Sequence, residues 1–142
     1  MGLGATLTAR DYRSLAELRH QIRLFAHFSE QAVRSAGLNP HQHQLMLALK
    51  GLPPNLRPSI RELAKRLQIQ HHSTVELVNR LARSGYVRRQ RGDVDRREVL
   101  ILLTVKGERV LSELSLHHRA ELRKAGPALI GALRAVMREQ RI

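Results

Sequence analysis

The sequence contains no cysteine, no tryptophan, and only two tyrosines and two phenylalanines. The lack of cysteine excludes disulfides, thiolate metal sites and redox sensing by thiols. The scarcity of aromatic side chains argues against recognition of single-stranded bases by stacking. A nucleic-acid partner, if there is one, is therefore expected to be a duplex.

Long apolar runs are also missing. No stretch approaches the roughly 18 apolar residues of a membrane-spanning helix, and the opening MGLGATLTAR lacks the apolar core of a signal peptide. We therefore expect a soluble, cytoplasmic protein that does not enter a membrane. Its 142 residues fit one domain, although a helical fold of this size can need a partner chain to complete its core.

Positive charge is abundant. The chain has 25 Lys and Arg against 12 Asp and Glu, with a net charge of +13 and a pI near 11.6. Such a surface attracts polyanions. Nucleic acid is the first candidate partner, and an anionic membrane surface is the competing one.

Two helices are predicted in the first third of the chain. From Asp11, apolar residues recur at helical spacing until Gly37, which is typical of a stop signal: Leu15, Leu18, Ile22, Phe25 and Ala32. The second helix begins after Asn39, which can cap it, with Pro40 at its first position and Gln42 as the capping-box partner; Gly51 ends it.

Two further helices follow a proline-rich connector at residues 53–58. Ser59 is the predicted cap, and Glu62 is expected to reach back to its backbone N–H. The first buried stripe is Ile60, Leu63, Ala64 and Leu67, and the second, which ends at Gly85, is Thr74, Leu77, Val78, Leu81 and Ala82. Only about three residues separate the two helices, the spacing of a helix-turn-helix.

A hairpin and two more helices complete the chain. Tyr86 and Val87 lead into a first strand, Gly92 and Asp93 supply a turn, and residues 99–103 suit a second strand. Thr104 can cap a helix whose predicted buried face comprises Val105, Val110, Leu111, Leu114 and Leu122. A break at Gly126 and Pro127 is expected to precede a last helix that presents Ile130, Leu133 and Met137.

This order of segments resembles the MarR family of transcriptional regulators over nearly the whole chain. The similarity is carried by GLNPHQHQLMLAL, SIRELAKRL and LVNRLARSGYVRR, and above all by DRREVLILLTVKG, with its D-x-R followed by L-T-x-x-G. Two residues depart from the pattern: Asn39 replaces the usual Thr, and Gln68 stands where such turns often have Gly.

The resemblance implies a mainly α fold with a small β-hairpin wing. A winged helix-turn-helix lobe would span about residues 39–104, within a single domain whose dimerisation helices span about 8–37 and 105–142. The resemblance also implies a homodimer, and the apolar stripes of the first and last helices independently need something to cover them. The alternative is that these stripes pack only within one chain.

The resemblance makes the helix before Gly85 a recognition helix. A helical wheel turns its polar side chains outward, and those nearest its start are candidates for reading base edges: Gln70, His71, His72, Ser73 and Glu76. Further along the outward face lie Asn79, Arg80 and Arg83, of which the two arginines are candidates for phosphate contacts.

The hairpin supplies the predicted wing, with the candidate residues Arg88, Arg89, Arg91, Asp95, Arg96 and Arg97. Guanidinium groups bind phosphates bidentately and enter narrow minor grooves, and Arg91 and Arg96 are the best tip candidates. Asp95 is expected to hold Arg97 in one rotamer on one side of a strand, a pairing that the family resemblance supports. Two alternatives stay open: that the acids only temper repulsion, and that the segment is a solvated turn.

The predicted function is that of a sequence-specific, double-stranded-DNA-binding transcriptional regulator. The resemblance implies a ligand-responsive repressor on a pseudo-palindromic operator, often with a small aromatic effector. Neither a cofactor nor an enzymatic activity is expected. Alternatives are an RNA-associated or protein-binding winged helix, and a metal-responsive regulator using His41, His43, Glu113, His117 or Glu121.

Overall fold

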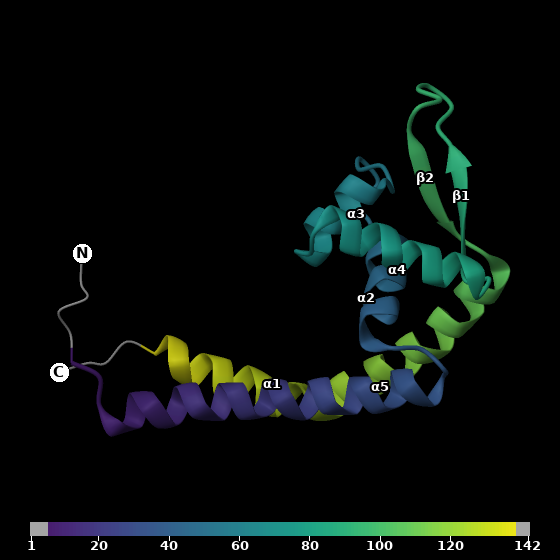
Figure 1. Ribbon diagram of the computed structural model, residues 1–142. Coiled ribbons are helices and arrows are strands. Elements are labelled where there is room, and N and C mark those ends of the chain that lie inside the picture. The colour runs from purple at the N-terminus through teal and green to yellow at the C-terminus, as the bar shows by residue number, and fades with distance from the viewer. Residues whose placement is uncertain (1–5, 139–142) are drawn as a thin grey trace. The chain divides into compact units, whose positions relative to one another are not determined.

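A computed structural model of the chain describes residues 6–138 (Figure 1). The described elements are α1 Ala9–Ser35, α2 Pro40–Lys50, α3 Ile60–Leu67, α4 His71–Arg83, β1 Val87–Arg91, β2 Val99–Leu103 and α5 Val105–Met137. The prediction of a mainly helical fold with one hairpin is confirmed. Residues 139–142 of the predicted C-terminal segment, and residues 1–5 of the opening stretch, lie outside the described residues.

The chain divides into two compact units, which we call the central unit, residues 32–115, and the terminal unit, residues up to 31 and from 116 onward. The central unit contains α2, α3, α4 and the hairpin. The terminal unit contains most of α1 and the C-terminal half of α5. Among residues 6–138, no helix has both the length and the hydrophobicity that crossing a bilayer requires.

Helix α2 begins as the sequence predicts. The Asn39 side chain accepts a hydrogen bond from the Gln42 backbone N–H at 2.9 Å, and the Gln42 side chain accepts one from the Asn39 N–H at 2.9 Å. Pro40 occupies the first helical turn. This capping box satisfies backbone donors that a helix otherwise leaves unpaired at its start.

Helix α3 begins with half of the predicted capping box. The Ser59 hydroxyl accepts from the Glu62 N–H at 3.2 Å. The predicted return bond from Glu62 is wrong, because the Ser59 N–H instead donates to the carbonyl of Arg57 at 2.8 Å within the proline-rich connector. The single bond is enough to define the start of the helix.

The turn between α3 and α4 is built around Gln68. This residue adopts a left-handed conformation, with φ 56° and ψ 43°, and the Ile69 N–H donates to the Ala64 carbonyl at 3.1 Å. The tight turn therefore forms without glycine, at a conformational cost of about 1–2 kcal/mol. The helix-turn-helix spacing that the sequence predicts is confirmed.

The core of the central unit joins α2, α3 and α4 to β2. Its fully buried hydrophobic side chains are Val33, Leu45, Met46, Leu63, Val78, Leu81 and Ile101. Thr74 is also fully buried, and its hydroxyl donates to the Gln70 carbonyl at 3.0 Å, so its polarity is satisfied. The predicted buried stripes of α3 and α4 are confirmed at Leu63 and Leu77 and their neighbours.

The hairpin is antiparallel, and its register runs from Val87 opposite Leu103 to Arg91 opposite Val99. The connector before α3 pairs with it, because the Ile101 N–H donates to the Pro58 carbonyl at 2.8 Å. Strand β2 is thus hydrogen-bonded both to β1 and to the connector that precedes α3.

Helix α5 differs from the prediction in two respects. It runs unbroken from Val105 to Met137, so the predicted break at Gly126 and Pro127 is wrong. The proline ring is compatible with helical φ and removes one N–H, and the alanine- and leucine-rich turns on either side continue the helix. The prediction that Val105 and Leu122 are buried is also wrong, because their side chains are 76% and 41% exposed. For Val105 the reason is the 100° step per residue, which places it across the helix from the buried Leu114.

In the terminal unit, α1 lies beside the C-terminal half of α5 (Figure 1). The His118 ring lies at the edges of Phe25 and Phe28, with centroids 6.0 and 6.1 Å away, and its Nε2 is 2.7 Å from the Ser29 hydroxyl. Many larger apolar side chains of this unit are not covered by the described residues: Leu15, Ile22, Leu24, Leu116, Ile130, Leu133 and Met137 are exposed.

Candidate nucleic-acid interface

Helix α4 separates its residues into two faces. Its apolar face is buried in the central unit, and the predicted recognition residues are all exposed: Gln70, His71, His72, Ser73, Glu76, Asn79, Arg80 and Arg83. Gln70 is the N-cap residue, but its side chain makes no capping hydrogen bond. The first turn of α4 therefore presents amide, imidazole and hydroxyl groups to the outside, where they can bind base edges.

One acid and one arginine of this face form an ion pair. The guanidinium of Arg80 lies 3.0 Å from the Glu76 carboxylate, one helical turn earlier, and both side chains are more than half exposed. A pair this exposed contributes little to stability. It does restrict the rotamers of two residues that face outward from α4.

The wing places its arginines on different faces of the hairpin. Arg88 donates to the side-chain oxygen of Gln90 at 3.0 Å, and Arg89 donates to the side-chain oxygen of Asn79 on α4. Because side chains alternate along a strand, Arg88 and Arg89 point to opposite sides. Of these two arginines, Arg89 is the one that links the wing to α4.

The tip of the wing is an ordered turn. The Arg91 guanidinium donates to the Arg96 carbonyl at 2.9 Å, and the Gly92 N–H donates to the Glu98 carbonyl at 2.9 Å. A side chain at position 92 would not fit, because a Cβ there would lie 2.7 Å from the carbonyl oxygen of Asp95. The arginines of the tip are thus held by a defined backbone.

Asp95 and Arg97 form the predicted pair, although in the turn rather than along a strand as predicted. The strands end at Arg91 and resume at Val99, so the two residues are held by turn geometry instead of strand alternation. The Asp95 carboxylate accepts from the Arg97 guanidinium at 3.2 and 3.3 Å and from its backbone N–H at 2.9 Å. These hydrogen bonds hold the pKa of Asp95 below its usual range, with the larger effect from the Arg97 side chain and the smaller one from its backbone N–H.

Sequence reasoning missed Arg57 and Glu98. The Arg57 Nε lies 2.7 Å from the Glu98 carboxylate and ties the proline-rich connector to the base of the wing turn. No local pattern predicts this pair, since 41 positions separate the two residues. The contact orients the wing, and Glu98 offsets part of its positive charge.

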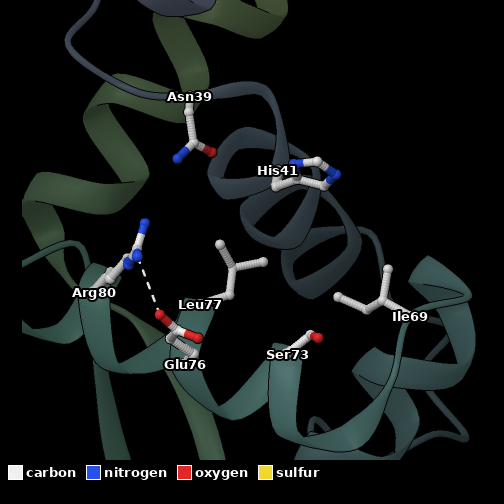
Figure 2. A pocket seen from close by; sticks show the side chains of 7 residues that line it. All are labelled: Asn39, His41, Ile69, Ser73, Glu76, Leu77 and Arg80. Carbon is white, nitrogen blue, oxygen red and sulfur yellow. Dashed lines mark hydrogen bonds and ion pairs between the residues drawn. The ribbon is translucent and has the colours of Figure 1, made fainter.

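A cavity of about 340 Å³ lies between the start of α2 and the exposed side of α4. Figure 2 shows Asn39 and His41 facing Ser73, Glu76 and Arg80 across it, with Leu77 and Ile69 as its apolar part. Three of its residues, Ser73, Glu76 and Arg80, therefore belong also to the predicted recognition surface.

The candidate metal ligands do not come together. His41 is exposed at the cavity, His43 is buried within α2, and Glu113, His117 and Glu121 lie along α5. Within the part of the chain that the structure describes, no group of three or more His, Asp and Glu side chains is placed to hold a metal ion.

The antiparallel wing, the helix-turn-helix and the exposed face of α4 define a winged helix-turn-helix protein. Residues 36–98, most of the lobe that carries this site, match the sequence model of the MarR family. The central unit is therefore similar to proteins of the MarR family, the resemblance that the sequence predicts. A comparison with curated protein sequences finds no match.

Solved structures share the fold over most of the chain. RV1404 from Mycobacterium tuberculosis is 23% identical, with a TM-score of 0.71 and 92% of each chain covered. AbsC, a MarR family transcriptional regulator from Streptomyces coelicolor, is 21% identical, with a TM-score of 0.71 and 85% of this chain and 81% of AbsC covered. A mutant of MepR from S. aureus, bound to an oligodeoxyribonucleotide, is 18% identical, with a TM-score of 0.66 and coverages of 84% and 82%.

Proposed function

We propose that the chain is a sequence-specific, double-stranded-DNA-binding transcriptional regulator that acts as a homodimer on a pseudo-palindromic operator. The observation that carries this proposal is the continuity of the exposed face of α4 with an arginine-rich wing. The net charge of +13 supports a polyanionic partner. A MarR-family match and a structural neighbour bound to an oligodeoxyribonucleotide agree with this function.

The two parts of the site would perform different tasks. The first turns of α4 would enter the major groove, where polar side chains distinguish base pairs by their donors and acceptors. The wing would lie over the flanking backbone, where Arg91 and Arg96 contact phosphates or a narrow minor groove. Base contacts would then set specificity, and the arginines would set affinity.

The homodimer is supported by the terminal unit. Ile22 on α1 and Ile130 and Leu133 on α5 are each about half exposed among the described residues. Exposed apolar side chains at helical spacing are typical of an interface. A two-fold dimer would present two copies of α4 to half-sites about 10 base pairs apart.

The response to a ligand would use the cavity beside α4. A small molecule that binds there would contact Ser73, Glu76 and Arg80, residues that the DNA-bound state also needs. The apolar side chains of Ile69 and Leu77 suit an aromatic ring, and His41 and Arg80 suit an acidic substituent. Binding of ligand and DNA would then exclude each other, so the ligand would release the regulator from its operator. The proposed role is that of a repressor that its ligand releases.

Selection from genomic DNA tests the proposal. Purified full-length protein is mixed with fragmented genomic DNA at low salt, and bound fragments are sequenced and footprinted. We expect enrichment of an imperfect palindrome and a steep fall of log affinity with log salt, with a slope of order several. Structured RNA added as competitor should displace little of the DNA, whereas an RNA-associated protein would prefer the competitor.

Failure to enrich any fragment, or a slope near zero, would reject the proposal. The effector is tested on the recovered operator with small aromatic acids, which should release the DNA and raise the melting temperature of the free protein.

A further inference from the structure

The wing contains one arginine whose side chain is directed at the recognition helix. Arg89 lies opposite Ile101 in the hairpin, and Ile101 is fully buried. Directly opposite residues of an antiparallel pair share a face. Arg89 therefore stands on the face of the hairpin that packs on the core, and its guanidinium donates to the side-chain oxygen of Asn79 on α4.

We propose that Arg89 is a positioning residue that sets what Asn79 reads in the DNA, rather than a further phosphate contact. This inference rests on the proposed function, because it assigns a specificity-determining role within the DNA-binding site.

The chemistry of the two groups fixes the orientation of the asparagine amide. A guanidinium only donates hydrogen bonds, so the atom that faces it must be the Asn79 carbonyl oxygen and not its NH₂ group. The NH₂ group is then the part of Asn79 that remains available to the groove. Without this bond the amide could rotate and present either group.

The orientation determines which bases suit Asn79. An unrestrained asparagine pairs bidentately with adenine, accepting from N6 and donating to N7. With its oxygen turned toward Arg89, Asn79 presents its NH₂ group to the groove and donates to acceptors such as purine N7, guanine O6 or thymine O4. The wing thus alters sequence preference through a base-reading residue, without touching a base itself.

Arg88 provides a matched control. It is adjacent on the same strand and carries the same charge, but it faces the other side of the hairpin and bonds to Gln90. Removal of either arginine therefore subtracts one positive charge from the wing, and only removal of Arg89 releases Asn79.

The experiment is a selection from a double-stranded DNA library with a randomised core, using full-length protein. Wild type and Arg88→Ala are expected to select the same motif, with weaker binding by Arg88→Ala. Arg89→Ala is expected to change the preference at one position per half-site toward adenine, by about fivefold or more. Asn79→Ala should lose the base preference at that same position. The double variant, with Asn79→Ala and Arg89→Ala together, should show the same base preference there as Asn79→Ala alone.

A further variant keeps Arg89 in place. Asn79→Asp retains an acceptor for Arg89 but replaces the outward donor by a second acceptor, so it should favour a base that donates, cytosine or adenine, at the same position. Far-UV circular dichroism checks that each variant is folded. If Arg89→Ala does not fold, Asn79→Asp decides whether Arg89 positions Asn79.

The outcomes separate the two proposals. If Arg89→Ala keeps the wild-type motif and loses affinity for all duplexes as Arg88→Ala does, Arg89 contacts the DNA phosphate backbone. The positioning role is then wrong, and the proposed function stands. Retention of the wild-type preference by Asn79→Asp overturns the positioning role too. If wild-type protein enriches no motif at all, the proposed function itself fails.

Discussion

At the scale of single residues, three arginines of the wing have hydrogen-bond partners within the hairpin in the absence of DNA. Arg88, Arg91 and Arg97 each bond to an acceptor within the hairpin. A long side chain held in one rotamer loses less conformational entropy when it binds. Under the proposed function, this surface is partly organised for phosphates, and each arginine would exchange or share its partner when DNA binds.

The division of tasks between α4 and the wing is tested by single substitutions. Arg91→Ala should weaken binding to the operator and to random duplexes alike and reduce the salt slope by about 1, because it removes a phosphate contact. His72→Ala and Glu76→Ala should instead reduce discrimination between sequences, by about 1–3 kcal/mol for each base that the side chain reads. Fluorescence anisotropy on both duplexes measures these effects.

The wild-type protein is the control for all three variants, and circular dichroism confirms their fold. If all three lose the same affinity on operator and random DNA, the division between base-reading and phosphate-binding residues is wrong.

The pH dependence of the wing follows from Asp95. Because Arg97 lowers the pKa of this carboxyl, the ion pair between the two is fully present above the usual carboxyl range and disappears as the pH falls through the lowered pKa. Carbon-detected NMR of the Asp95 carboxyl should show this low value. In Arg97→Ala the pKa should rise only partway, because the backbone N–H at position 97 still donates.

An Asp95 titration that does not change when Arg97 is removed would show that the side chains do not interact in solution. Arg96→Ala is the matched control, since it removes a neighbouring charge and leaves all three hydrogen bonds from Arg97 to Asp95 in place.

At the scale of elements, the end of α4 is fastened to the start of α5. Lys106 donates to the Ser84 carbonyl at 2.8 Å, and the Thr104 hydroxyl donates to the Gly85 carbonyl at 2.6 Å while it accepts from the Gly107 N–H. These bonds satisfy carbonyls just beyond the last turn of α4. Helix α4 is therefore anchored at its C-terminal end by the first turn of α5 and the residue before it.

Gly107 makes this junction possible. A Cβ at position 107 would lie 2.1 Å from the Tyr86 carbonyl oxygen, so Gly107→Ala should lower the free energy of unfolding by about 1–3 kcal/mol through steric strain. Gly131→Ala on the same helix meets nothing within 4 Å and should raise it by about 0.5–1 kcal/mol. Urea unfolding followed by circular dichroism measures both. Equal stability of the two variants would contradict the packing at the junction.

At the scale of the whole molecule, charge and apolar surface have different places in the sequence. The positive groups that we assign to DNA lie on α4 and the wing, in the central unit. The exposed leucines and isoleucines of α1 and the end of α5 belong to the terminal unit. Each surface suits one partner class: a polyanion for the first, and a second copy of the chain for the second.

The dimer is tested by a charge on the apolar side of α5. Ile130→Glu should weaken self-association by about 100-fold or more, because an uncompensated buried charge costs about 3–5 kcal/mol. Ala128→Glu adds the same charge on the other side of the helix, at an exposed position, and should leave the dimer intact. Sedimentation velocity measures both variants, and operator affinity should fall with the dimer.

A wild-type chain that sediments as a monomer at micromolar concentration would contradict the homodimer. Equal weakening by both variants would place the interface elsewhere.

The sequence by itself determined the features that depend on near neighbours. The Asn39 and Gln42 capping box, the Thr104 cap, the stop at Gly85 and the two strands were all predictable, because each relies on interactions within a few residues. The exposed face of α4 followed from its 3.6-residue period. The MarR-like motifs added the order in which these elements assemble.

Only the tertiary structure decided what depends on distant partners. It carries α5 through Pro127, turns Val105 away from the core, and engages the Ser59 N–H within the connector. It also directs Arg89 to Asn79, joins Arg57 to Glu98, and places the start of α2 and α4 so that both line one cavity. Local patterns cannot specify such contacts, because their energies arise only when segments far apart in the chain are packed together.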